Sequence, residues 1–320
     1  MPHEDLQTAA RHTLADCMNV RSGEVVAVVT DDLTRAVGEA LAHAAHELDA
    51  EPVLAVMRPR EVNGEEPPAP VAALMRDSAL LLLATHFSLS HTRARKAASR
   101  AGARAASLPG ITEDIMVRTM AVDYRDVAAR TRVLAERLRE VDSFRLTSES
   151  GTDMTINAAG VEFSADTGLY HQPGDFGNLP AGEACGGPVL AGSTGVAVFD
   201  GSFAGVGLLS APITVEFEDG LATSIAGGAE AEALSRMLEP FGDGGKVLAE
   251  LGVGTHPEAE VRGVVLEDEK VLGTVHLAFG NNVGFGGDND VAIHVDGVIR
   301  APTLVTDGGD LLIENGNPHF

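Results

Sequence analysis

Two histidines in the last fifth of the chain lie close to an aspartate. His294 and Asp296 are separated by one residue in the segment Val-Ala-Ile-His-Val-Asp, and His276 lies on an earlier apolar segment. Side chains two residues apart in an extended strand point to the same face, so we expect His294 and Asp296 side by side. Because imidazole nitrogens and carboxylate oxygens bind divalent metals, the three residues predict a metal site.

Two glutamates occur in segments that are unusual for a charged residue. Glu183 follows a proline and a glycine in Asn-Leu-Pro-Ala-Gly-Glu, and Glu250 lies in the apolar run Leu-Ala-Glu-Leu-Gly. A carboxylate among leucine and alanine is costly to desolvate unless it is paired or bound to a metal, so Glu250 is poorly explained as a core residue. An outward-pointing Glu250 would escape this argument, and that alternative stays open.

The two histidines and three carboxylates exceed the ligands that one tetrahedral zinc uses. Such a surplus fits two metal ions about 3.5–4 Å apart, bridged by a carboxylate and by a water that attacks a carbonyl carbon. Zinc, cobalt and manganese suit these ligands, and so does iron. The predicted ligands are Glu183, Glu250, His276, His294 and Asp296.

Glu269 and Lys270 lie shortly before His276 in a chain that has only three lysines. A solvated turn would explain this pair. The alternative is that Lys270 contacts a substrate carboxylate or a metal-bound water, while Glu269 contacts a metal ligand and orients it without binding the metal itself. The two cysteines, Cys17 and Cys185, form no Cys-x-x-Cys motif and predict ordinary buried thiols, with no disulfide and no structural zinc.

Composition restricts the class of protein. A length of 320 residues allows one large domain or two ordinary ones, and the net charge of −24 offers no basic surface for nucleic acid. No apolar run approaches the roughly 18 residues of a membrane span, and the N-terminus has no secretory signal pattern. We therefore expect a cytoplasmic protein that binds neither nucleic acid nor membrane.

The first part of the chain alternates apolar runs with amphipathic segments. Apolar runs at 25–29, 52–56 and 80–83 predict strands, and the stretches at 33–48, 71–76 and 93–101 predict helices. Continuous apolar strands alternating with helices are typical of a parallel sheet covered on both faces. The turn after the first strand contains no glycine, so a dinucleotide site is not predicted there.

The second part of the chain has a different pattern. After an amphipathic helix at 123–141, short alternating strands are separated by glycine turns, with one further helix near 229–238. The predicted fold is thus an α/β N-terminal layer with a parallel sheet, followed by a β-rich α+β metal-binding domain. We place the first domain at residues 1–108 and the second, catalytic domain at 109–320.

The ligand segments together resemble the M29 family of metallo-aminopeptidases, the aminopeptidase T and aminopeptidase S type, in the leucyl aminopeptidase-like superfamily. The resemblance covers most of residues 109–316, including Pro109-Gly110, Gly151-Thr152-Asp153 and Asp307-Gly308. It implies a two-metal centre in a homodimer. The ligands that it implies are Glu183, which is also catalytic, and Glu250, His276, His294 and Asp296.

This chain departs from the aminopeptidase pattern at one position, since Asn282 and Val283 stand where that family has a tyrosine. The same superfamily resembles ring-cleaving dioxygenases that act on dihydroxypyridines with a single iron(II). In those enzymes a histidine stands at the position of Glu250 and a serine at that of His276, and this chain has neither change.

The leading hypothesis from the sequence is a hydrolase that cleaves N-terminal peptide bonds of short peptides with a metal-activated water. Its catalytic residues would be Glu183, Glu269 and Lys270. One alternative is a mononuclear iron(II) dioxygenase of the dihydroxypyridine type, acting on a small molecule. The other is a homologue that binds metal without catalysis.

Overall fold

The computed structural model describes residues 2–320 and divides the chain into two compact units. The first unit comprises the residues up to Asp126 together with Gly168–Ala181, and the second comprises Val127–Thr167 and Gly182–Phe320. These units differ from the expected ranges of 1–108 and 109–320. Residues 168–181 return to the first unit because they carry a strand that joins its sheet.

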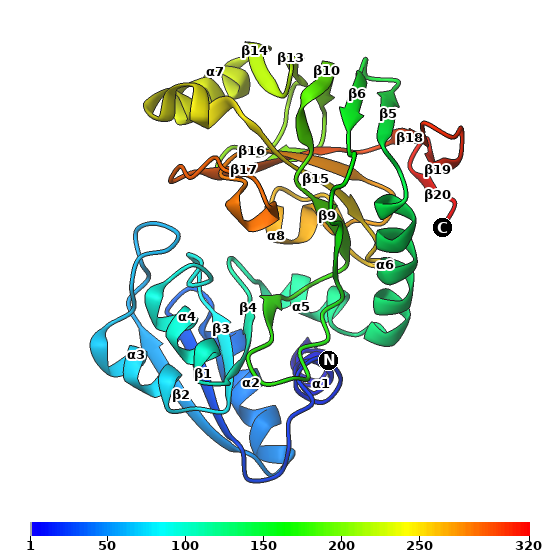
Figure 1. Cartoon of the computed structure of the whole chain (residues 1–320). Coiled ribbons are helices and arrows are strands. Elements are labelled where there is room, and N and C mark those ends of the chain that lie inside the picture. The colour runs from blue at the N-terminus through cyan, green and yellow to red at the C-terminus, as the bar shows by residue number, and fades with distance from the viewer. Residues whose placement is uncertain (1) are drawn as a thin grey trace. The chain divides into compact units, whose positions relative to one another are not determined.

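The first unit contains a five-stranded parallel sheet in the order β2-β1-β3-β4-β8 (Figure 1). The apolar runs form its interior, where β3 is buried throughout and only the first residue of β1 is exposed. The predicted α/β layer is confirmed. The strands are β1 Val25–Asp31, β2 Glu51–Met57, β3 Leu80–Ala84, β4 Arg104–Ser107 and β8 Phe176–Asn178.

Helices connect the strands of this sheet, as the alternating pattern predicted. The strands β4 and β8 were not predicted, because neither contains a run of large apolar residues. The helices are α1 Pro2–His12, a π-helix Thr13–Cys17, α2 Arg35–Glu47, α3 Ala69–Arg76, α4 Arg93–Arg100 and α5 Glu113–Thr119.

The second unit is built on two antiparallel sheets. The eight-stranded sheet has the order β14-β13-β10-β6-β5-β18-β19-β20 and the seven-stranded sheet the order β12-β11-β17-β16-β15-β9-β7. The strands of the first are β5 Ser143–Ser148, β6 Asp153–Asn157, β10 Val189–Phe199, β13 Ile213–Glu218, β14 Leu221–Ala226, β18 Pro302–Thr306, β19 Leu311–Glu314 and β20 Asn317–Pro318. Those of the second are β7 Ser164–Asp166, β9 Glu183–Gly186, β11 Ser202–Phe203, β12 Gly207–Leu208, β15 Leu248–Gly254, β16 Val275–Gly280 and β17 His294–Ile299.

Few helices accompany these sheets, in agreement with the predicted β-rich character. The remaining helices are α6 Tyr124–Arg139, α7 Ala229–Leu238, a 3-10 segment Glu239–Lys246, α8 Val265–Asp268 and a 3-10 turn Val283–Phe285. Nowhere in residues 2–320 does a helix combine the length and the apolar character needed to cross a membrane.

The two sheets of the second unit share one apolar core, and phenylalanine rings connect them. Phe279 of β16 lies 5.5 Å from Phe217 of β13 and 5.9 Å from Phe199 of β10, measured between ring centroids. Phe203 of β11 lies 5.7 Å from Phe279. Tilted aromatic pairs at these spacings add to the stability gained from burial. Phe279 thus holds the sheet of β15, β16 and β17 against the other sheet.

We predict that Phe279→Ala destabilises the protein by about 3–5 kcal/mol, because it leaves a cavity among three rings. Denaturant unfolding measures this loss. The matched control is Val133→Ala, since the Val133 side chain on α6 is 47% exposed and its removal leaves no cavity. An unchanged midpoint for Phe279→Ala would contradict the role of this ring in joining the sheets.

Candidate metal centre

The predicted ligands of β15, β16 and β17 lie on one face of their sheet. The register pairs Glu250 with Ala278, and Ala278 with Asp296, so both carboxylates share a face across three strands. His276 and His294 are each two residues from a member of this row and therefore point to the same side. The predicted alternation along His294-x-Asp296 is found in the structure.

The strand β9 brings Glu183 to the same face, because Glu183 pairs with Gly254 and lies two residues from Cys185. The opposite face of the four strands belongs to the apolar core. Its buried residues are Ala184, Leu251, Val253, Val275, Leu277, Phe279, Val295 and Ile299. One face of this sheet thus stabilises the unit, and the other is free to carry polar groups.

Glu250 lies between the two imidazoles. Its Oε2 is 3.0 Å from Nε2 of His294, and its Oε1 is 3.6 Å from Nε2 of His276. Nε2 of His294 also lies 3.5 Å from Oδ1 of Asp296. The other ring nitrogen of His294, Nδ1, contacts the carbonyl oxygen of Asn281 at 2.8 Å. Glu250 is buried, so the sequence alternative of an outward-pointing side chain is wrong.

Gly252 makes room for His276. The two residues are paired across β15 and β16, and a Cβ atom on Gly252 would lie 2.0 Å from Nε2 of the imidazole. A side chain at this position would displace the imidazole, so glycine is favoured here by the close contact and not by its backbone angle. The ring of His276 therefore lies over Gly252, and its Nε2 is 3.2 Å from Glu183 and 3.6 Å from Glu250.

Several buried polar atoms of the centre have no hydrogen-bond partner among the described residues. They include both ring nitrogens of His276, which is 1% exposed, and Oε2 of Glu183. Nε2 of His276 and Oε2 of Glu183 are 3.2 Å apart without the geometry of a hydrogen bond. Because buried polar atoms are normally paired, a cation between them is the simplest partner, and the residues fit a divalent metal.

Lys270 is buried and holds two carboxylates together. Its Nζ lies 2.6 Å from Oε1 of Glu183 and 2.7 Å from Oε1 of Glu269, with Asp166 at 3.9 Å. The alternative of a solvated turn is therefore wrong, since Lys270 is 1% exposed. Its ammonium neutralises Oε1 of Glu183 and leaves Oε2 directed at His276.

Burial and charge shift the protonation of these groups. Burial raises the pKa of Glu269 to about 8, with Lys270 opposing and the charges of Glu183 and Asp296 adding to the shift. For Glu250, burial also raises the pKa, but the two imidazoles outweigh it and hold the pKa far below its ordinary range. The carboxylate of Glu250 is therefore ionised, as a metal ligand must be.

The pKa values of the two histidines are shifted upward, opposite to that of Glu250. Burial lowers the pKa of His276, but the carboxylates of Glu183 and Glu250 outweigh it and raise the pKa well above 6.5. Burial likewise lowers the pKa of His294, and Asp296 and Glu250 together raise it well above 6.5. Without a metal, both rings therefore carry a proton that a metal must displace.

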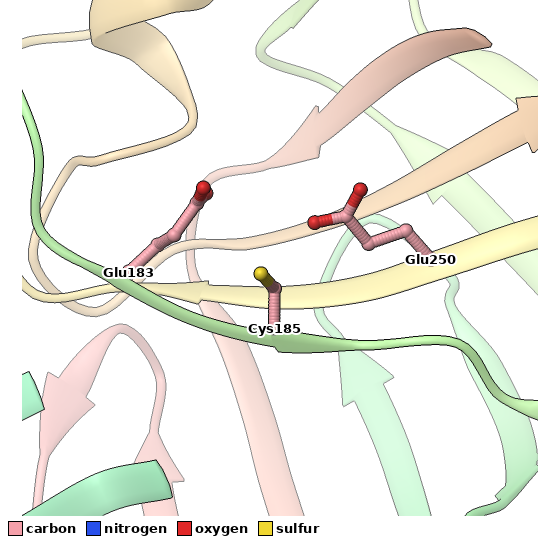
Figure 2. Close-up of side chains that lie close together, drawn as sticks. All are labelled: Glu183, Cys185 and Glu250. Carbon is pink, nitrogen blue, oxygen red and sulfur yellow. The ribbon is translucent and has the colours of Figure 1, made fainter. Parts of the chain in front are cut away.

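The structure adds Cys185 to this face, which sequence reasoning treated as an ordinary buried thiol. Figure 2 shows its sulfur between the carboxylates of Glu183 and Glu250. Burial raises the pKa of the thiol well above its ordinary value, and the two glutamates add to the shift. The signal was present in the sequence, because Glu183 and Cys185 are two residues apart in a strand.

Three overlapping groups of the described residues bring metal-binding atoms within 4.8 Å of one another. Every predicted ligand belongs to at least one group, and so does Glu269, whereas Lys270 contributes a cation instead. Nitrogen and oxygen donors in this mixture suit iron, zinc, cobalt and manganese. The groups are Glu183 with Cys185 and Glu250, Glu183 with Glu269 and His276, and Glu250 with His294 and Asp296.

Comparisons with known proteins give a consistent fold and one family. Residues 5–318 match the sequence model of the family described as 2,5-dihydroxypyridine 5,6-dioxygenase. The structure of 2,5-dihydroxypyridine dioxygenase from Pseudomonas putida KT2440 is similar, with a TM-score of 0.82, 18% identity and coverage of 99% of this chain and 97% of that chain. No curated protein matches the chain by sequence.

Wild-type AmpT from Thermus thermophilus is also similar, with a TM-score of 0.71, 19% identity and coverage of 99% of both chains. The predicted resemblance to M29 aminopeptidases therefore holds for the fold. The predicted activity was wrong. The family match over nearly the whole chain is to dioxygenases, which overturns the hydrolase, aminopeptidase and protease interpretation.

We predict that Gly252→Ala displaces His276 and lowers the affinity for a divalent metal by about 10- to 100-fold, as a change that misorients a ligand does. Zinc titration followed by calorimetry measures the affinity. Gly308→Ala is the matched control, because a Cβ there meets nothing closer than 3.7 Å. Equal affinities for the two variants would exclude a ligand role for His276.

We also predict that metal affinity rises with pH across and above neutrality. The metal-free protein holds protons on His276 and His294 because neighbouring carboxylates raise both pKa values, and a metal binds only the neutral rings. Lowering the pH therefore weakens binding, and binding releases protons. Calorimetry in buffers of different ionisation enthalpy measures this release, and an affinity independent of pH would contradict the assignment.

Proposed function

This chain belongs to the family described as 2,5-dihydroxypyridine 5,6-dioxygenase, and on that premise we propose that it is an iron(II)-dependent dioxygenase that opens a small dihydroxylated heteroaromatic ring. The substrate proposed is a dihydroxypyridine or a close relative. Both atoms of dioxygen enter the product, so the reaction needs no external reductant. A homodimer, implied only by the resemblance to the aminopeptidases, stays a prediction.

The observation that carries this proposal is the position of Glu250 between His276 and His294. Imidazole and carboxylate groups are the ligands that non-haem iron(II) oxygenases use, and such centres leave other coordination positions open. Nε2 of His294 and Nε2 of His276 approach different oxygens of the same carboxylate. Asp296 adds a further oxygen beside His294. Glu250, His294 and Asp296 bring metal-binding atoms within 4.8 Å of one another, so these three residues form the proposed iron position. His276 belongs to the neighbouring group with Glu183.

Iron(II), when bound, supplies the one-electron chemistry by which dioxygen reacts with an electron-rich ring. The protein residues bind the metal and orient its ligands and the substrate. Lys270 is a positioning residue, since its ammonium contacts both Glu183 and Glu269 and, as a cation, cannot itself bind the metal. The half-buried carboxyl group of Glu269 is a candidate to exchange a proton with a substrate hydroxyl. His294, whose side chain is 31% exposed, marks the side of the centre that is open to solvent.

The proposal is tested with protein purified without an affinity tag and loaded anaerobically with iron(II). We expect consumption of one dioxygen per 2,5-dihydroxypyridine and incorporation of both labelled atoms from ¹⁸O₂ into the product. Zinc-loaded protein should be inactive, because zinc has no accessible redox state. His294→Ala should lower kcat/KM by at least about 100-fold, since loss of a ligand exceeds the 10- to 100-fold effect of an outer residue.

The control variant is His43→Ala, because the His43 side chain is 57% exposed and belongs to the first unit. It should retain full activity and iron. Iron-loaded protein that consumes no oxygen with dihydroxypyridines or related dihydroxylated rings would overturn the proposal. In that case the metal-binding homologue without catalysis becomes the better interpretation.

A further inference from the structure

Cys185 lies on the ligand face of the sheet although its type would suit the apolar face. It is paired with Gly252 of β15 on one side and with Ser164 of β7 on the other. The flanking residues of β9, Ala184 and Gly186, point to the core side instead. A buried cysteine normally behaves as a small apolar residue, but the face that Cys185 occupies is the one that carries charges.

The surroundings of the sulfur are acidic. Sγ of Cys185 and carboxylate oxygens of Glu183 and Glu250 lie within 4.8 Å of one another, and the three side chains converge in Figure 2. The other polar neighbour is Oγ of Ser164, 3.5 Å from the sulfur. A thiol is a weak donor, so one S–H group cannot compensate two buried carboxylates. Lys270 and the two imidazoles balance these charges in the metal-free protein, and a metal ion would take the place of the imidazole protons.

A second observation points to a cation in this space. Glu183 is 9% exposed, and its Oε2 has no hydrogen-bond partner among the described residues. Lys270 is already committed to Oε1 of the same carboxylate, at 2.6 Å. Nε2 of His276, also without a hydrogen-bond partner, lies 3.2 Å from the free oxygen. One of these atoms belongs to Glu183, whose carboxylate is in the same group of metal-binding atoms as the sulfur of Cys185.

We propose that Cys185 is a metal ligand, and that its thiolate with Glu183 and Glu250 forms a position for a thiophilic divalent cation such as zinc, cadmium or cobalt. This position adjoins the iron position and shares Glu250 with it. When the metal–sulfur bond forms, the S–H bond breaks and the proton leaves to the solvent buffer, with no change in oxidation state. Three negative charges, from Glu183, Glu250 and Cys185, are then balanced by the dication and by Lys270.

Ligand chemistry supports this position. Thiolate is the soft ligand that selects zinc and similar metals over magnesium or calcium, which prefer oxygen alone. The hydroxyl of Ser164 donates to the carbonyl oxygen of Cys185 at 3.2 Å, and its oxygen lies 3.5 Å from the sulfur, so Ser164 orients Cys185 as the outer partners of metal ligands do. The inference rests on the metal centre of the proposed function, but it does not depend on the ring-opening reaction.

The experiment is a cobalt(II) titration of the full-length protein after removal of metals by a chelator, under anaerobic conditions. Thiolate ligation gives a sulfur-to-cobalt charge-transfer band in the near ultraviolet, whereas nitrogen and oxygen ligands give only weaker visible bands. We expect the charge-transfer band in the wild-type protein and in Cys17→Ser. Cys17 is the matched control, because it is the other buried free cysteine and belongs to no group of metal-binding atoms.

In Cys185→Ser we expect the charge-transfer band to be lost, the visible bands to remain, and the affinity for the thiophilic ion to fall by at least about 10-fold. Visible bands without the charge-transfer band in the wild-type protein would overturn the role of Cys185 and leave the proposed function untouched. Failure of the wild-type protein to bind cobalt would overturn the metal centre and the inference together.

A second measurement covers the case in which Cys185→Ser does not fold. The wild-type protein is treated with a small alkylating agent, with and without cadmium, and the peptide that contains Cys185 is quantified by mass spectrometry. Protection of Cys185 by cadmium, with unchanged labelling of Cys17, supports the inference. Equal alkylation of Cys185 in both samples contradicts it. Oxygen uptake by iron-loaded wild-type protein tests the proposed function separately.

Discussion

Glu183 and Glu250 are buried side by side on one sheet face, and the compensation of their charge determines how the centre is built. An isolated carboxylate in such a place costs several kcal/mol, so each needs cationic or hydrogen-bonding partners. Lys270 provides one such partner for Glu183, and the imidazoles provide partners for Glu250. Oε2 of Glu183 and the ring nitrogens of His276 have no hydrogen-bond partner among the described residues, and a divalent cation would provide one.

The seven-stranded sheet makes this arrangement possible because one of its faces packs in the apolar core while the other carries the polar groups. The apolar face packs against the second sheet. The free energy gained by burying it helps to offset the desolvation of the charged groups on the other face. Small residues between the ligands leave space for the long side chains, as Gly252 does beneath His276. Rigid strands with close, small neighbours hold metal ligands more accurately than loops do.

The five predicted ligands indicated metal chemistry from the sequence but did not indicate the reaction. Carboxylate and imidazole donors set the charge and the geometry around an ion, and these are compatible both with a hydrolytic pair of ions and with a single iron. The reaction depends also on which metal is bound and on which substrate fits, and short motifs report neither. The match over residues 5–318, which integrates the whole chain, favoured the dioxygenase family instead.

The sequence by itself determined those features that rest on local periodicity. The alternation of apolar runs and helices gave the parallel layer, and the spacing of His294 and Asp296 placed both on one face, because side-chain direction in a strand follows from the backbone alone. The burial of Lys270, the contact of Gly252 with His276 and the return of β8 to the first sheet were decided only by the tertiary structure. They depend on the pairing and register of segments distant in the chain, which the packing of the whole unit selects.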